Sequence, residues 1–283
     1  WWGIAMLRCY EFTGNATYLE SSEYVWERVR ATAWDNTFGG GVWWTNWHES
    51  GPGCEDTSSY KNAITNELFL YLSARLGMVA PVGSSRRDGY VYYARRAADW
   101  LVYTSGLVNE DYLVNDGLNC VTGLNNNDTT WTYNQGVILA GLAHTTQLVG
   151  DDSYISVAES IAVSVFDKLT DSNGVLTEAC VSQNSTTRSD CMNSASDRMF
   201  KGAFALYLWD LAKVSTNDAF RSRVGQFLQD NFNSMLDLTA NTGALNYCQS
   251  SSRPLPGSVS SDKVEVIAVV WMSELEIVRR MAY

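Results

Sequence analysis

One stretch of the chain contains the unit from which the fold is built: TYNQGVILAGLAHTTQLVGDDSYISVAESIAVSVFDKL, residues 132–169. Its first part, residues 132–149, is apolar or small on nearly every side, which is typical of a helix buried all round. Its second part, residues 153–169, has one apolar stripe opposite a polar face, which is typical of a helix with one side in water. Gly150 lies between the two parts, where a left-handed glycine ends a helix. The stretch therefore predicts a hairpin of one inner and one outer helix.

This unit recurs along the chain. EFTGNATYL (11–19) repeats QLVGDDSYI (147–155), with Gly14 in the place of Gly150, and KVSTNDAFR (213–221) is a weaker copy. Buried segments are expected to begin near residues 1, 60, 132, 197 and 263, and amphipathic segments near 18–33, 88–105, 153–169 and 217–236. The period of about 65 residues exceeds the common helical repeats of about 34 to 47 residues and suits hairpins of two long helices.

Alternating inner and outer helices predict an all-α fold, an (α/α)6 toroid, with an open solenoid as the alternative. Such a toroid has six inner helices, and the sequence shows five. We therefore expect a single domain over residues 1–283 that lacks roughly its first helical hairpin, with the beginning of the domain missing.

The chain contains one pair of consecutive aspartates, Asp151–Asp152. Two carboxylates are what a glycoside-cleaving enzyme needs. However, the pair occupies the place of Asn15–Ala16 in the other copy of the repeat. Asp is also a preferred residue at a helix N-terminus, which its charge stabilises. The sequence therefore favours a helix cap over a catalytic pair.

Composition excludes several classes of function. The net charge of −11 disfavours binding to nucleic acid or to an anionic membrane surface. Six cysteines without a Cys-x-x-Cys pair, together with two histidines, argue against structural zinc. Sequons at Asn15, Asn127 and Asn184 and the even number of cysteines indicate a secreted glycoprotein. Cysteine pairing stays open among fifteen connectivities, with Cys180–Cys191 as the best candidate for one bridge.

Polar side chains head the inner helices. In a toroid these starts gather around one mouth, so amides and charges there predict a site for a polar ligand. The alternative is helix capping and one ion pair. The candidates are Trp1, Trp2, Asn62, Asn66, Tyr133, Asn134, Gln135, Asp197 and Lys201. The loop FGGGVWWTNW (38–47) adds Trp43 and Trp44, which we expect to form a platform for a sugar ring unless they belong to the core.

The chain resembles the glycoside hydrolase family 76 endo-α-1,6-mannanases, including fungal cell-wall members. The resemblance rests on WWGIAMLRCYEFTGNATYL, FGGGVWW, YKNAITNELFLYLSARL, TYNQGVILAGLAHTTQLVGDDSYI and DRMFKGAFALYL. It implies an (α/α)6 toroid, hydrolysis of α-1,6-mannan with retained configuration, and no metal or cofactor. It also implies that fungal members process or transfer mannan-bearing glycans at the cell wall.

The resemblance assigns a substrate-binding role to Asn62, Asn66, Tyr133, Asn134, Gln135, Asp197 and Lys201. The four tryptophans are substrate-binding candidates on their positions alone, and none of the eleven candidates is assigned to catalysis. The family has two adjacent catalytic aspartates just before the position of Trp1–Trp2, and the sequence begins at that position. A retaining mechanism needs both carboxylates, so we expect the chain as it stands to be inactive. The expected partner is α-1,6-mannan or a mannooligosaccharide, bound by a monomer outside the cell, secreted or at the cell wall or plasma membrane.

Three alternatives remain. A non-catalytic mannan-binding homologue would also retain the polar inner starts. A toroid enzyme acting on uronates or N-acyl sugars would require more cationic residues at those starts if its substrate were anionic. A helical scaffold for protein partners would present an exposed apolar groove.

Overall fold

The computed structural model describes residues 1–45, 60–178 and 199–242, with side chains to residue 234. These residues form eight α-helices and no strand. The helices are α1 (Trp2–Thr13), α2 (Ala16–Thr32), α3 (Ala63–Val79), α4 (Ser85–Asp99), α5 (Thr132–Val149), α6 (Ser153–Lys168), α8 (Phe200–Val214) and α9 (Asp218–Thr242). A short 3-10 helix, η1 (Thr37–Gly39), and one π-helical turn, η2 (Trp100–Thr104), complete the regular structure of this part.

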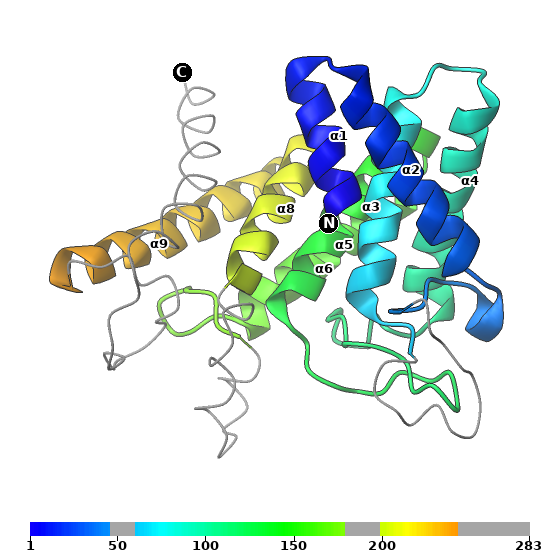
Figure 1. Cartoon of the computed structure of the whole chain (residues 1–283). Helices are drawn as coiled ribbons and strands as arrows, with labels where there is room; N and C mark the ends of the chain where they lie inside the picture. Colours follow the sequence, from blue (N-terminus) through cyan, green and yellow to red (C-terminus); the bar gives the residue numbers. More distant parts are fainter. Residues whose placement is uncertain (46–59, 179–198, 243–283) are drawn as a thin grey trace.

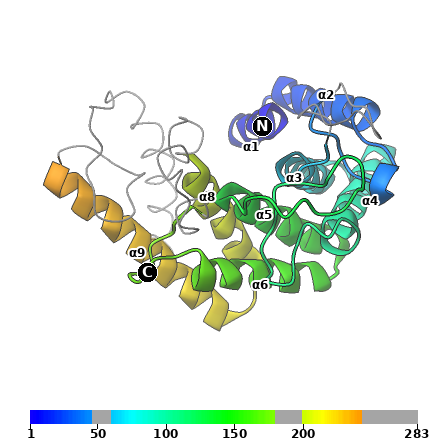
Figure 2. The same ribbon diagram turned by 90° about the horizontal axis from the view of Figure 1, so that it is seen from below.

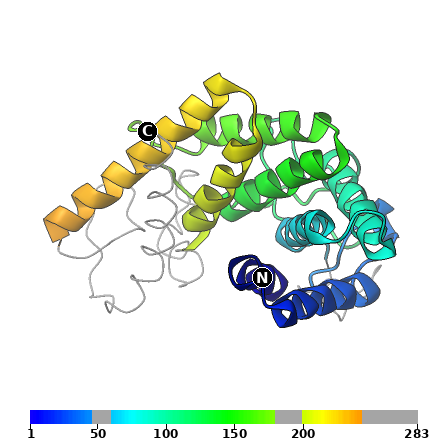
Figure 3. The same cartoon turned by 90° about the horizontal axis from the view of Figure 1, so that it is seen from above.

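The helices pair into four antiparallel hairpins that stand side by side along an arc (Figures 1, 2 and 3). Helices α1, α3, α5 and α8 form the inner row, and α2, α4, α6 and α9 form the outer row (Figure 2). This alternation confirms the expected α/α toroid. The inner helices begin at residues 2, 63, 132 and 200, close to the predicted starts. The predicted fifth inner start near residue 263 lies outside the described residues.

Helix α5 packs between α3 and α8, and two glycines make this packing possible. A Cβ at Gly136 would lie 2.4 Å from the Cα of Phe204 on α8. A Cβ at Gly141 would lie 2.8 Å from the Leu70 side chain on α3. Because these contacts leave no room for a side chain, the inner helices approach each other closely along the axis of the molecule.

The turns within hairpins are built as the repeat predicts. Gly14 and Gly150 end α1 and α5 in the left-handed conformation, with φ of 69° and 70°. The Asn15 side chain then accepts a hydrogen bond from the Thr17 N–H at 3.0 Å. Asp151 accepts one from the Ser153 N–H at the same distance. Asp151–Asp152 therefore forms the cap of an outer helix, as predicted.

An ionic network around one buried carboxylate joins the four inner helices. The Asp210 carboxylate of α8 lies 3.7 Å from the Arg8 guanidinium of α1 and 3.8 Å from the imidazole of His144 on α5. It accepts a hydrogen bond from the Tyr71 hydroxyl of α3 at 3.5 Å and pairs with Lys213 at 2.5 Å. The network fixes the inner helices to one another.

Three further features bear on the sequence predictions. Cys9 is free and exposed, and Cys120 is disulfide-bonded; Cys180 and Cys191 lie outside the described residues. The sequon residues Asn15 and Asn127 are exposed, and Asn184 lies outside the described part. Among the described helices, none has the length and apolar character needed to cross a bilayer.

Candidate functional site

The starts of the inner helices come together under the loops that precede them. The Ala63 N–H at the start of α3 donates to the Asp116 carbonyl at 2.7 Å. The Thr132 N–H at the start of α5 donates to the Glu178 carboxylate at 3.1 Å. The Tyr133 ring lies 4.1 Å from the ring of the first residue of α8. The starts of α3 and α5 therefore lie against loops, and those of α5 and α8 are in contact. We call this end of the inner row the mouth.

Two of the predicted ligand-binding amides hold these loops. Asn66 accepts a hydrogen bond from the Val42 N–H at 2.6 Å and donates to the Val42 carbonyl at 2.9 Å. Gln135 makes the same pair of bonds with Val114, at 2.7 and 2.8 Å. Both side chains are fully buried. Each amide therefore bonds to both the N–H and the carbonyl of one loop residue, as a neighbouring strand would. Its hydrogen-bonding groups face the loop.

The glycine-rich loop is fixed by a buried cation. The Lys61 ammonium has no exposed surface and pairs with Asp35 at 2.6 Å. It also donates to the carbonyls of Gly40 and Gly41 at 2.7 and 3.1 Å. Gly41 has a φ of +94°, and a Cβ there would lie 2.9 Å from the Trp100 ring. Glycine is needed here because the backbone is left-handed and lies against an indole.

The predicted tryptophans separate into two groups. Trp43 is 1% exposed, and its indole N–H donates to Asp35 at 2.9 Å. The expectation that Trp43 offers a face to a sugar is therefore corrected, because loop packing covers the ring. Trp44 is 48% exposed, and Trp1 and Trp2 are 57% and 75% exposed. These three rings are accessible to a ligand.

A continuous set of accessible groups crosses the mouth, and we call Trp44, Tyr60, Asp116 and Tyr133 the mouth row. The rings of Trp44 and Tyr60 meet edge to face at 5.4 Å. The Tyr60 hydroxyl donates to the Asp116 carboxylate at 2.8 Å. Burial raises the pKa of Tyr133, and the negative charge of Asp116 raises it further. Tyr60, Asp116 and Tyr133 are half-buried, so each keeps a surface for a ligand.

Two fully buried polar side chains beneath the mouth row lack hydrogen bonds. Neither carboxylate oxygen of Glu67 has a partner, and neither does the oxygen or nitrogen of the Asn134 amide. Burial raises the pKa of Glu67 well above its ordinary value, and Asp116 raises it further. Burial likewise raises the pKa of Asp116, although the Tyr60 hydrogen bond and the nearby Asn134 amide act in the opposite direction. Unpartnered buried polar groups are rare and call for a functional explanation.

The remaining predicted residues differ in where they lie. Asn62 caps α3, accepting from the Thr65 N–H at 3.3 Å. Lys201 lies buried in the first turn of α8. Asp197 lies outside the described residues. In the described part of the chain, no three His, Cys, Asp or Glu side chains form a group that could hold a metal ion.

Sequence reasoning missed three groups, namely Glu67, Tyr60 and Asp116. Glu67 had a visible signal, because it is an acidic residue on a predicted buried helix and directly follows Asn66. Tyr60 was read only as the beginning of that helix. Asp116 had no such signal, because it lies in a long loop without periodicity.

Comparison with known proteins places this geometry in a family. The family model described as glycosyl hydrolase family 76 matches residues 1–279. A Candida albicans protein named mannan endo-1,6-alpha-mannosidase DCW1 is 30% identical over 223 residues, covering 73% of this chain and 44% of that protein. A Candida glabrata protein of the same name is 28% identical, covering 75% of this chain and 46% of that protein. The chain thus spans about half the length of the curated relatives it matches.

Solved structures show the same architecture. An inactive α-1,6-mannanase from Salegentibacter sp., with two consecutive aspartates changed to asparagine, was solved with α-1,6-mannotriose bound. It superposes with a TM-score of 0.66 at 25% identity, covering 83% of this chain and 62% of that chain. An α-mannanase from Bacteroides thetaiotaomicron superposes over 100% of this chain and 69% of its own, with a TM-score of 0.73 at 19% identity, and supports the fold alone. The inner and outer helices, the mouth that they form and the match over residues 1–279 show that this chain belongs to glycosyl hydrolase family 76.

Proposed function

We propose that this chain supplies the mannan-binding mouth of a glycosidase that acts on α-1,6-linked mannan. The observation that carries the proposal is the mouth row above Glu67 and Asn134. Its rings offer apolar faces, and its hydroxyls and carboxylate offer hydrogen bonds. This is the mixture that fixes a polar ligand in a largely preformed site. The α-1,6-mannotriose bound to the Salegentibacter relative and the names of the fungal relatives support mannan as the ligand.

Asn134 would contact the ligand or a water molecule that the ligand orders. Its amide has one acceptor and two donor positions. None of them meets hydrogen-bond geometry with a protein group, although the amide lies close enough to Asp116 to lower the pKa of that carboxyl. A mannose hydroxyl can donate and accept at once, so it is a suitable partner. By contrast, Asn66 and Gln135 would act indirectly by holding the loops.

We assign no catalytic role to Asp151–Asp152. In the Salegentibacter relative, the inactive variant is changed at two consecutive aspartates. Here the one consecutive pair lies in the turn between α5 and α6, where the Asp151 carboxylate accepts a hydrogen bond from the Ser153 N–H. We propose that the chain as it stands binds mannan without cleaving it. The alternative is a mannan-binding homologue without catalytic activity, for which we also expect binding without cleavage.

The test is calorimetric titration of the chain with α-1,6-mannotriose. We expect saturable binding that weakens at least tenfold in Asn134→Ala and is unchanged in Asp152→Asn, the matched control on the outer surface. Equal affinity in wild type and Asn134→Ala would show that mannotriose does not bind at the mouth. Incubation with linear α-1,6-mannan then separates binding from cleavage, because released oligosaccharides would show that the chain holds its own catalytic pair.

We further propose that the chain is a monomeric single domain that functions outside the cell. The disulfide of Cys120 supports an oxidising compartment. The exposed sequon residues Asn15 and Asn127 are accessible to glycosylation.

A further inference from the structure

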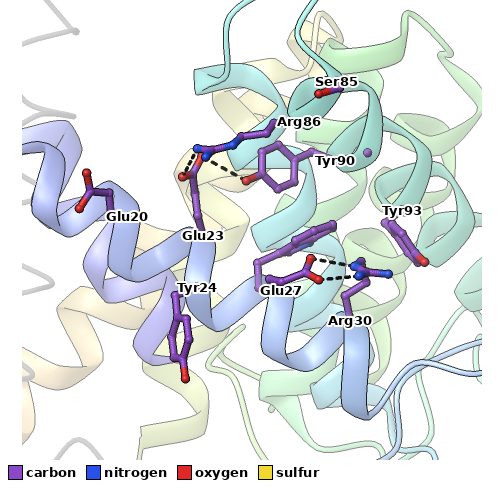
Figure 4. A pocket seen from close by; sticks show the side chains of 11 residues that line it. Glu20, Glu23, Tyr24, Glu27, Arg30, Ser85, Arg86, Tyr90 and Tyr93 are labelled. Atoms are coloured by element: carbon purple, nitrogen blue, oxygen red, sulfur yellow. Dashed lines mark hydrogen bonds and ion pairs between the residues drawn. The ribbon is translucent and has the colours of Figure 1, made fainter.

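A second groove opens on the outer wall of the molecule, between α2 and α4 (Figure 4). Its volume is about 750 Å³. This is within the range of about 300 to 1,000 Å³ that is typical of small-molecule sites. The buried rings of Trp26 and Tyr90 form its floor. No member of the mouth row lines it, so the groove is separate from the candidate site.

The polar groups of this groove are held in position. Glu23 accepts hydrogen bonds from Arg86 at 2.8 Å and from the Tyr90 hydroxyl at 3.1 Å. Glu27 pairs with Arg30 (Figure 4). These contacts lie within and between α2 and α4, so the side chains do not need to be ordered by a ligand. Such preorganisation lowers the entropic cost of binding.

Gly89 keeps the groove open. It lies inside α4, where glycine costs about 1 kcal/mol relative to alanine. A Cβ at this position would meet no atom within 4 Å, and the residue does not have a positive φ. Neither helix geometry nor packing therefore requires glycine. A larger side chain here would project into the groove, because Gly89 is among its lining residues.

Another groove between outer helices shows which features are particular to the α2–α4 groove. Between α6 and α9 a groove of about 670 Å³ also follows from the spacing of outer helices. Its lining includes Ser156, Ser160 and Ser164 and, like the α2–α4 groove, more carboxylates than cations, but its rings are only those of Tyr112 and Phe220. The α2–α4 groove instead gathers Tyr24, Trp26, Tyr90 and Tyr93. The aromatic lining is therefore not a consequence of the architecture.

The lining indicates the class of ligand. Three carboxylates, Glu20, Glu23 and Glu27, are nearly balanced by Arg30 and Arg86. A strongly charged ligand of either sign gains little from such a surface. Alternating donors and acceptors beside aromatic rings suit a neutral ligand rich in hydroxyl groups.

We infer that the α2–α4 groove is a second carbohydrate-binding site, which takes a neutral oligosaccharide. Its identification with a further segment of α-1,6-mannan rests on the proposed function. A polymer held both at the mouth and on the outer wall would bind more tightly than at either site alone, because the second contact is intramolecular.

The test is the stoichiometry of α-1,6-mannotriose binding measured by calorimetry. Wild type should bind two molecules. Gly89→Trp should lose one of them, while Gly225→Trp, which changes a helical glycine of α9 with open space around it, should keep both. Ser85→Trp, at the other end of the groove, is a second blocking variant in case Gly89→Trp does not fold. Two bound molecules in both blocking variants would overturn the inference.

The same titrations separate this inference from the proposed function. Asn134→Ala should lose the mouth site and keep the one that Gly89→Trp removes. If Asn134→Ala has no effect while Gly89→Trp abolishes binding, the outer site stands and the mouth proposal fails. If Gly89→Trp has no effect while Asn134→Ala abolishes binding, the mouth stands and the outer site fails.

Discussion

Among individual side chains, Glu67 has the least ordinary environment. Burial and the charge of Asp116 raise its pKa well above 4.5. The folded protein therefore keeps a proton that the unfolded chain releases above about pH 4.5. Stability contributed by this group is present at low pH and is lost as pH rises toward the folded-state pKa. We expect Glu67→Gln to remove this loss, which has a slope of up to about 1.4 kcal/mol per pH unit. Urea unfolding at several pH values between 5 and 8 measures it.

Glu20→Gln is the control for this prediction, because Glu20 lies exposed on α2. Its unfolding free energy should follow the wild-type pH dependence. If wild type and Glu67→Gln gave parallel curves, Glu67 would be ionised in the folded protein and would have a partner.

The amides show how far sequence reasoning reaches for single residues. Asn62, Asn66, Asn134 and Gln135 were predicted to stand at the starts of inner helices, and they stand at the starts of α3 and α5. Their roles could not be predicted, because the role depends on the loop that reaches each amide. Val42 bonds to Asn66 and Val114 bonds to Gln135, whereas no loop backbone group bonds to the side chain of Asn134.

The sequence predicts where the helices lie, but it does not predict the course of the loops. Apolar periodicity located α5 and α6 nearly to the residue, because burial and helix period act on the same positions. The loop before α3 has no period. In the described part of this loop, the backbone from residue 35 to residue 41 is held by Lys61, and a lysine is ordinarily expected in water.

Removal of the Lys61 ammonium should release this loop. Lys61→Met would leave the buried carbonyls of Gly40 and Gly41 without their donor. We expect a loss of about 2 to 3 kcal/mol in the free energy of unfolding, since a buried acceptor left unpaired costs about 1 to 3 kcal/mol. Thermal and urea unfolding measure the loss. Lys168→Met is the matched control, because Lys168 pairs with Asp111 at the surface, where such pairs contribute under about 1 kcal/mol. Equal losses in the two variants would show that the buried ammonium has no special role.

Across the four hairpins, the order and direction of the helices followed from the repeat, but the contacts that join them did not. Gly136 and Gly141 gave no hint of which neighbour would approach each of them. Likewise, Arg8, Tyr71, His144 and Asp210 are far apart in the sequence and meet only once the inner helices are assembled. These contacts therefore form only in the assembled arc. Their contribution to the free energy of unfolding can be tested through its dependence on pH.

Asp210 should make the assembled arc sensitive to acid. Burial alone would raise its pKa, but the adjacent His144 imidazole and the charge of Lys213 hold the pKa of Asp210 well below 3.8. A carboxylate with a depressed folded-state pKa contributes stability that is present above pH 3.8 and is lost as pH falls. We expect Asp210→Asn to lose on the order of 3 kcal/mol at pH 6, because the buried carboxylate that joins Arg8, His144 and Lys213 loses its charge, and to lose less than wild type between pH 6 and pH 3. Asp167→Asn, which changes a surface pair with Arg223, should leave both values near wild type. An Asp210→Asn protein with wild-type stability at pH 6 would show that the inner helices are held by apolar packing alone.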